Sequence, residues 1–267
     1  GQGVVAKFDP ATYSDAIAFA RIGEGSLGGK ARGLAFMNSM LVKYCQYAKY
    51  ENVRVTIPRT VVVATDYFDA FIRNNGLEYV LTTEMTDEEI LSEFVSSTLP
   101  YKLREALKAY VRTVSGPLAV RSSSKLEDSH YQPFAGIYST YMIPYTEGNE
   151  DRQLRLLQKA IKSVYASTYF AASKAYVQSS QNLIAEEKMA VVIQEVCGTE
   201  QDGLFFPTLS GVARSINYYP IGDETPEEGV CNIALGLGKL VVDGGRTLRF
   251  SPRYPQKVLQ TSTPELA

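Results

Sequence analysis

The chain is poor in the residue types that most often build metal centres and disulfide scaffolds. Its 267 residues include no tryptophan, one histidine and three cysteines. The cysteines, Cys45, Cys197 and Cys231, are odd in number and far apart, so they match neither a zinc-ligand spacing nor a disulfide framework. This usage is typical of a reducing compartment, and we expect a cytoplasmic protein in which each cysteine is a small core residue.

Long apolar runs and an excess of one charge are also missing. No apolar segment reaches membrane-spanning length, and the N-terminus lacks a basic-then-apolar signal pattern. The 27 Lys and Arg residues nearly balance the 29 Asp and Glu residues, which gives a net charge of −2. We therefore expect neither a membrane nor a nucleic-acid partner. The most local basic cluster, between Arg152 and Lys162, is interpreted as the solvated face of a helix.

What the chain does contain is enough apolar residues, 45% of the total, to bury a large core in one big or two modest domains. Its first half has mainly helical spacing. A strand is predicted over Thr60–Ala64, after the helix-breaking step Ile57–Pro58, and Asn75–Gly76 is predicted to end a helix in a left-handed cap. The predicted helices are Tyr13–Arg21, Ala31–Tyr50, Asp66–Asn74, Asp87–Ser96 and Tyr101–Val114.

The second half, from Leu118 onward, changes to strand patterns that one long helix, from about Glu150 to Gln178, interrupts. We therefore predict an α+β chain with a boundary near Gly116, which separates a helix-rich subdomain, 1–116, from a strand-rich subdomain, 117–267. The predicted strands are Leu118–Ser122, Ile137–Ile143, Met189–Glu195, Gly203–Leu209, Val230–Leu235 and Thr247–Phe250.

A glycine-rich segment, Ser26–Gly33, opens the second predicted helix and carries Lys30. Backbone N–H groups and the positive dipole end at a helix start attract an anion, and Lys30 adds a point charge. Gly23–Gly28 also fits G-x-G-x-x-G, but that fingerprint needs a preceding strand, and the pattern there predicts helix. The P-loop pattern G-x-x-x-x-G-K-[ST] does not fit at Lys30, because it would need glycine in place of Glu24 and a hydroxyl residue in place of Ala31. The alternative is that the glycines merely turn the chain and Lys30 is solvated.

A second candidate for anion binding is Arg121, in the segment Pro117–Asp128. It ends the short apolar run that opens this segment, and three serines follow it. Arginine offers a rigid fork of donors that matches phosphate oxygens bidentately, and its charge cannot be titrated away. One arginine at a strand end proves little by itself. Combined with Lys30, however, it indicates a site for a phosphate-bearing ligand.

In their order along the chain these two segments and several others resemble the nucleotide-binding domain of the pyruvate phosphate dikinase and phosphoenolpyruvate synthase family. The resemblance covers roughly residues 20–255, nearly the whole chain. The segments that carry it are Gly28–Lys30, Ile57–Pro58, Ala119–Ser123, Glu127–Asp128, Phe134–Gly136, Val192–Val196, Ser210–Ala213 and Leu235–Gly238.

The resemblance implies an ATP-grasp fold, in which two subdomains clasp ATP with Mg²⁺. It also implies a kinase-type transferase that passes phosphate from ATP to a histidine on a separate domain and then to pyruvate. Both of those further domains would belong to the same full-length protein. Lys30 and Arg121 would carry the transfer by positioning and charge neutralisation, and Val192–Val196 would lie against the adenine. The nucleotide-binding residues it implies are Lys30, Arg121, Gly136, Thr140, Gln194, Glu195, Val196 and Lys239.

One residue departs from the family pattern, because Lys239 stands where the family has a glutamate that helps to hold magnesium. An ammonium group cannot coordinate Mg²⁺ and would repel it. Three alternatives stay open. Nearby carboxylates such as Asp243, Glu195 or Glu228 hold the metal, or Lys239 binds phosphate directly, or phosphoryl transfer is lost and only binding remains. The metal ligands are therefore unknown at this point.

We expect an ATP-binding domain of a dikinase-like phosphotransferase that forms one part of a larger protein. Two alternatives are a non-catalytic nucleotide-sensing module and a dikinase for an acceptor other than pyruvate. The single histidine, His130, is predicted to be a loop residue without a catalytic role. In the family the phosphate-accepting histidine lies in a glycine- and threonine-rich segment of another domain, unlike the surroundings of His130.

Overall fold

A computed structural model describes residues 5–125, 140–179, 186–242 and 244–259 of the chain. It divides into two compact units, Gly1–Val196 and Cys197–Ala267. The subdomain boundary expected near Gly116 falls inside the first unit, because the strand that follows it joins the same sheet as strands that precede it. Each unit is described separately below.

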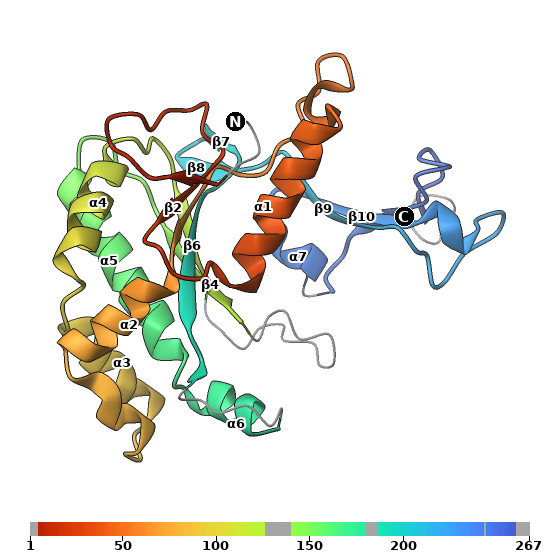
Figure 1. Ribbon diagram of the computed structural model, residues 1–267. Coiled ribbons are helices and arrows are strands. Elements are labelled where there is room, and N and C mark those ends of the chain that lie inside the picture. The colour runs from red at the N-terminus through yellow and green to blue at the C-terminus, as the bar shows by residue number, and fades with distance from the viewer. Residues whose placement is uncertain (1–4, 126–139, 180–185, 243, 260–267) are drawn as a thin grey trace. The chain divides into compact units, whose positions relative to one another are not determined.

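The first unit is built on a six-stranded mixed sheet (Figure 1). β1 is parallel to β2 and β2 to β3, whereas β6 is antiparallel to its neighbours β3 and β4, and β5 is antiparallel to β4. In spatial order the strands are β1 (Ala6–Lys7), β2 (Phe19–Ile22), β3 (Thr60–Val63), β6 (Met189–Glu195), β4 (Leu118–Ser124) and β5 (Thr140–Ile143).

Helices cover the two faces of this sheet unequally (Figure 1). On one face lie α2 (Thr65–Asn74), α3 (Asp87–Ser96), α4 (Tyr101–Val111) and α5 (Glu150–Ser167). Their apolar side chains and the sheet form the larger core, whose fully buried members include Phe71, Phe94 and Tyr165. On the other face α1 (Gly28–Lys43) buries Ala31 and Leu34 against a smaller cluster that includes Val62 and Val192. The α1 face therefore has room for polar groups.

Several elements match the sequence predictions at their ends. α3, β6 and β10 (Val230–Leu235) have the predicted bounds, and Gly76 has the expected left-handed φ of 60°. α3 begins with a capping box in which Thr86 and Glu89 exchange side-chain and backbone hydrogen bonds. Such caps are encoded within four residues, and this explains why local patterns locate them.

Other predictions are wrong because contacts distant in sequence override local spacing. The helix predicted over Tyr13–Arg21 is largely a loop that ends in strand β2, paired with β3. α1 ends at Lys43 rather than Tyr50, and Cys45 just beyond it has a left-handed φ of 52°. The single long helix is two helices, α5 and α6 (Ala171–Ser179), and α4 ends at Val111 instead of Val114.

The second unit consists of two small sheets. β7 (Thr199–Gln201) and β8 (Leu204–Phe206) form a hairpin, and β9 (Leu209–Arg214), β10 and β11 (Leu248–Phe250) form an antiparallel sheet. The strand predicted over Gly203–Leu209 is therefore split between β8 and the start of β9. The short helix α7 (Lys239–Val242) follows β10.

The two units contain helices and strands in the mixture expected of an α+β protein. In the described part of the chain, some of them are connected by short 3₁₀ helices, η1 (Gln46–Ala48), η2 (Leu77–Leu81) and η5 (Pro226–Glu228). Over the described ranges, no helix is long and apolar enough to cross a membrane. The predicted strand Ile137–Ile143 begins outside the described residues, and β5 accounts for its last four residues.

Candidate functional site

Residues 23–27 form the loop between strand β2 and helix α1. The strand that the sequence analysis judged to be missing before this loop is therefore present. The loop is held by the protein itself. The Asp66 carboxylate accepts the N–H groups of Glu24 and Gly25, both at 3.0 Å, and the Thr65 hydroxyl accepts the Ser26 N–H at 2.9 Å. An internal carboxylate thus occupies the loop amides. An external anion would have to bind at the start of α1 instead.

The start of α1 packs directly on β4. Gly28 has a φ of +73°, and a Cβ at this position would lie 2.1 Å from the Ser123 carbonyl oxygen. The Ser123 hydroxyl accepts the Ala31 N–H at 3.0 Å and donates to the Leu27 carbonyl at 2.8 Å. Only glycine fits this approach, because any side chain would collide with the strand backbone. The positive end of the helix is thereby fastened to the polar end of β4.

This packing places Lys30 of α1 against β4, next to Arg121 in the sequence of the strand. Lys30 Nζ donates to the Ser122 carbonyl at 2.7 Å, although the two residues are 92 positions apart. Arg121 Nη1 donates to the Gln194 side-chain oxygen at 2.9 Å. Lys30 and Arg121 are both partly buried. A guanidinium, an ammonium and a helix start in one place form a setting that suits phosphate groups.

A row of polar side chains continues from Arg121 across the α1 face of the sheet. Gln194 on β6 lies opposite Thr60 on β3, and its amide donates to the Thr60 hydroxyl at 3.2 Å. On the other side, Thr140 on β5 lies opposite Arg121 and is exposed. Paired residues in antiparallel strands share a face, as do residues two positions apart in one strand, so Arg121, Thr140, Gln194 and Thr60 all lie on this face. Three predicted site residues, Arg121, Thr140 and Gln194, are thus side chains of one face of the sheet, and Lys30 reaches the same strand from α1.

Glu195 is the last residue of β6, and Val196 follows it. The Glu195 side chain lies on the opposite face, where its Oε1 is 3.4 Å from Arg59 Nη1, and burial raises the pKa of its carboxyl group. The backbone N–H groups of Glu195 and Val196 both donate to protein carbonyls, those of Arg59 and Pro117, at 3.0 Å. Because Pro117 has no backbone N–H, it cannot donate a hydrogen bond to the Val196 carbonyl opposite it.

Two predicted nucleotide-binding residues remain. Lys239 begins α7 in the second unit, and Gly136 lies outside the described residues. Asp243, a candidate metal ligand, and His130, for which no catalytic role was predicted, also lie outside them. The sequence analysis missed Asp66, Ser123 and Arg59, whose roles depend on partners far away in the chain. Ser123 alone had a visible signal, its place in the run of three serines that follows Arg121.

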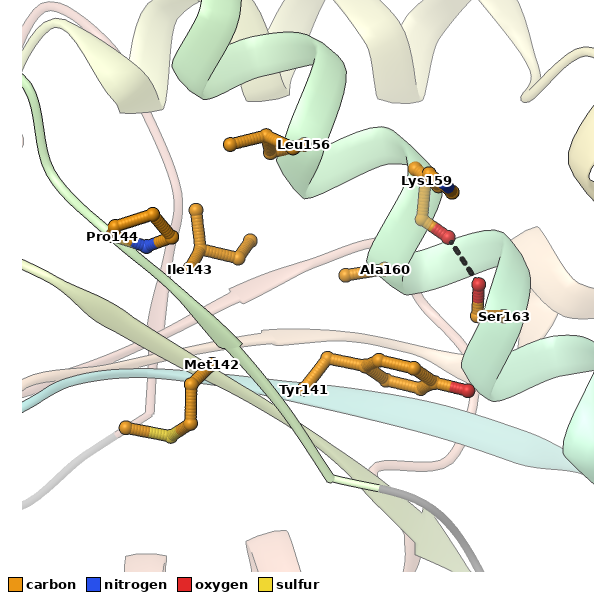
Figure 2. A pocket seen from close by; sticks show the side chains of 8 residues that line it. All are labelled: Tyr141, Met142, Ile143, Pro144, Leu156, Lys159, Ala160 and Ser163. Carbon is orange, nitrogen blue, oxygen red and sulfur yellow. Dashed lines mark hydrogen bonds between the residues drawn. The ribbon is translucent and has the colours of Figure 1, made fainter.

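A metal site does not emerge from the residues that the structure describes, since no three or more His, Cys, Asp and Glu side chains are grouped so as to hold an ion. A cavity of about 260 Å³ lies elsewhere, between β5 and α5 (Figure 2). In Figure 2, Tyr141 extends under α5 toward Ser163, whereas Met142 points away from the helix. The side chains that line this cavity are mostly apolar, and Arg121 and Lys30 are not among them. We place the candidate site at α1 and β4 because the charged groups converge there.

Comparisons with known proteins cover the part of the chain that contains this site. Residues 24–260 match the family model described as pyruvate phosphate dikinase, AMP/ATP-binding domain. The uncharacterized phosphotransferase YvkC of Bacillus subtilis (strain 168) is 31% identical over 198 residues, which cover 72% of this chain and 20% of that protein. The phosphoenolpyruvate synthase of Aeropyrum pernix is 28% identical over 240 residues, which cover 82% of this chain and 25% of that protein. The chain thus spans a fifth to a quarter of the length of these relatives.

Proposed function

The chain belongs to the pyruvate phosphate dikinase AMP/ATP-binding family, and on that premise we propose that the α1–β4 site binds the phosphates of ATP. The family makes this chain an ATP-binding domain of phosphotransferase type. Which residues bind the nucleotide, and what the phosphate is transferred to, are the subject of the proposal.

The observation that carries the proposal is the contact of Lys30 with β4. Lys30 Nζ is 2.7 Å from the Ser122 carbonyl, one residue from Arg121. In the proposed arrangement both cations reach a common anion, because Lys30 contacts the carbonyl of the residue that follows Arg121. We assign the terminal phosphates of ATP to Lys30, Arg121 and the first turn of α1. Charge-assisted hydrogen bonds of this kind are about twice as strong as neutral ones.

The base is assigned to the end of β6. In the proposed arrangement the carbonyl of Val196, whose ladder partner Pro117 lacks an N–H, accepts a hydrogen bond from the amino group of adenine. The N–H groups of Glu195 and Val196 are already bound to protein carbonyls. The proposal therefore uses the Val196 carbonyl, and not these N–H groups, to bind the base. Gln194 would lie beneath the nucleotide and link the base region to Arg121. The corresponding fold would be ATP-grasp.

The reaction we propose is phosphoryl transfer from ATP to a histidine nitrogen on another domain of a longer protein, with pyruvate as the final acceptor. The histidine nitrogen forms a bond to phosphorus while the bond from phosphorus to the leaving phosphate oxygen breaks. Lys30 and Arg121 would offset the charge on the phosphate oxygens during this step. A dikinase with another acceptor would use the same residues. A nucleotide sensor would bind ATP through them without transfer.

Magnesium enters the proposal only as the counter-ion of the substrate ATP. Mg²⁺ prefers carboxylate oxygens, and the carboxylates expected to hold it are engaged or undescribed. Glu195 contacts Arg59, and Glu228 accepts the Thr225 N–H in a capping box. Asp243 lies outside the described residues, and Lys239 supplies a positive charge. Among the described carboxylates, Glu195 and Glu228 are thus engaged within the protein, and the proposal assigns no metal ligand to the chain.

Calorimetry with ATP, ADP, adenosine and tripolyphosphate tests the proposal. The wild-type chain should bind ATP with a dissociation constant of millimolar or better and should form no phosphoenolpyruvate by itself. Lys30→Met should weaken ATP and tripolyphosphate binding and leave adenosine binding nearly unchanged. Lys43→Met, at the exposed far end of the same helix, is the matched control. Absence of ATP binding by the wild-type chain would overturn the proposal.

The full-length protein separates transfer from sensing. Incubation with ATP labelled in its terminal phosphates should yield a phosphoprotein that is stable in base and labile in acid, as phosphohistidine is. A full-length protein that binds ATP but takes up no label would favour the sensing alternative.

A further inference from the structure

The end of β6 is held from both faces by two consecutive residues, Arg59 and Thr60. On the α1 face, Thr60 lies opposite Gln194 and accepts a hydrogen bond from its amide. On the opposite face, Arg59 lies beside Glu195. The Arg59 carbonyl accepts the Glu195 N–H at 3.0 Å, and Arg59 Nη1 is 3.4 Å from Glu195 Oε1. Arg59 therefore contacts Glu195 through both its backbone and its side chain.

Arg59 is itself fixed by an aromatic ring and a second carboxylate. Its guanidinium carbon lies 4.6 Å from the centroid of the Tyr13 ring, and Nη1 is 2.7 Å from Asp15 Oδ1. The Arg59 side chain is only 14% exposed, whereas that of Asp15 is 96% exposed. A planar, weakly hydrated guanidinium stacks flat on a ring while its edge binds carboxylates, whereas an ammonium is a compact, strongly hydrated point charge that does not stack. The surroundings are thus suited to arginine and not to any basic residue.

Removal of the Arg59 charge would leave Glu195 in an unfavourable position. Burial raises the pKa of the Glu195 carboxyl group, the nearby Asp15 charge adds to the rise, and Arg59 opposes it. A half-buried carboxylate that loses its cation either takes up a proton or turns toward water. Either response removes the side-chain contact that holds Glu195 and leaves only backbone hydrogen bonds to Arg59 and Pro117 at Glu195 and Val196.

We propose, on the premise that this chain binds ATP as described above, that Arg59 is a positioning residue for the adenine base. It holds Glu195 and Val196 in the extended conformation that presents the Val196 carbonyl to the adenine amino group. Thr60 and Gln194 secure the same segment from the phosphate side. The pair Arg59–Thr60 thus couples the base to the phosphate site while touching neither ligand through the Arg59 side chain.

Binding of three probes to an Arg59 variant tests this role. Arg59→Met keeps the aliphatic part of the side chain and removes the fork. Adenosine and ATP should each bind about tenfold more weakly, which corresponds to ~1.4 kcal/mol. Tripolyphosphate, which lacks the base, should bind within about twofold of wild type. Arg59→Lys keeps the charge but loses the stack and one carboxylate contact, so its adenosine affinity should be intermediate.

The control is Arg112→Met, which removes an exposed ion pair between Arg112 and Glu150 and should leave all three affinities unchanged. Equal losses for adenosine and tripolyphosphate in Arg59→Met would mean a general structural role and would overturn the inference, as would wild-type adenosine affinity. If Arg59→Met does not fold, Arg59→Lys decides in the same way. A wild-type chain that binds no ATP would refute the proposed function itself, which is a separate result.

Discussion

Arg121 and Arg249 each lie on a strand, one in each compact unit, and they are bound in opposite ways. Arg249 on β11 donates to both carboxylate oxygens of Glu224, at 3.0 and 2.8 Å, and the two side chains are 15% and 11% exposed. Arg121 on β4 donates to the neutral amide of Gln194 at 2.9 Å. Within the described part of the chain, no carboxylate forms an ion pair with Arg121.

The difference separates an arginine that builds structure from one that is suited to a ligand. Glu224 also accepts hydrogen bonds from the Asn217 side chain and the Ile221 N–H, so its pair with Arg249 fastens the segment from Asn217 to Glu224. The charge of Arg249 is cancelled within the unit. Arg121 keeps its net charge, because an amide orients a guanidinium without neutralising it. An anion that reaches Arg121 therefore meets a positioned positive group.

The largest effect should come from disturbing the contact that brings Lys30 beside Arg121. Gly28→Ala would place a methyl group 2.1 Å from the Ser123 carbonyl at a left-handed φ, and should destabilise the fold by about 3 kcal/mol. Gly33→Ala, in the same helix with open space around it, should be neutral or stabilise the fold by up to ~1 kcal/mol. Urea unfolding of both variants measures this. Similar stabilities would mean that α1 is not tightly packed on β4.

The next effect should come from breaking the ion pair in the second unit. Arg249→Met leaves Glu224 largely buried without its cation and should cost on the order of 2–3 kcal/mol of stability. Arg253→Met, at an exposed position nearby, should change little. Calorimetric melting of the variants is the measurement. An unchanged melting profile for Arg249→Met would mean that Arg249 does not stabilise the second unit.

The same pair predicts how stability depends on pH. The hydrogen bonds from Arg249, Ile221 and Asn217 hold the pKa of Glu224 at about 2, below its ordinary value of 4.5. Because the folded state has the lower pKa, this stabilisation is complete above about pH 4.5 and is lost as the pH falls toward 2. Denaturation curves between these pH values should show the loss. Glu224→Gln should be less stable at neutral pH and should lack this part of the pH dependence.

Arg121→Ala should affect binding instead of stability. ATP and tripolyphosphate affinity should fall by about 1.5–3 kcal/mol, because a charge-assisted contact to phosphate is lost. Adenosine affinity should be nearly unchanged. Calorimetry gives the affinities, and a thermal melt of the same variant serves as the control. Equal losses for adenosine and ATP, together with a lower melting temperature, would make Arg121 a structural arginine like Arg249.

The smallest effect is expected at Lys239, which by the family resemblance stands where a metal-binding glutamate is expected. A fixed cation already offsets phosphate charge, so Lys239→Glu should increase the Mg²⁺ dependence of ATP affinity, by about threefold or ~0.7 kcal/mol. ATP titrations with and without Mg²⁺ at matched ionic strength measure it. An identical magnesium response in both proteins would mean that Lys239 does not stand in the metal position.

Local patterns predicted those elements whose signals lie within a few residues. The capping box of Thr86 and Glu89 begins α3, and a run of buried β-branched residues defines β6. The same reasoning failed at β2, because apolar spacing over Tyr13–Arg21 fits a helix as well as a strand. Only pairing with β3, distant in sequence, decided between them. The break between α5 and α6 likewise had no proline or glycine to announce it.

By itself, the sequence determined the family and the residue types of the candidate site, because Gly28–Lys30 and Ala119–Ser123 are contiguous motifs that survive without knowledge of contacts. The tertiary structure decided which of those groups are available. It filled the amides of the glycine loop with the Asp66 carboxylate and brought Lys30 to Ser122. It also placed Arg59 behind Glu195. Each of these contacts joins residues dozens of positions apart, and their distances depend on how the strands pair and the helices pack, which no local pattern encodes.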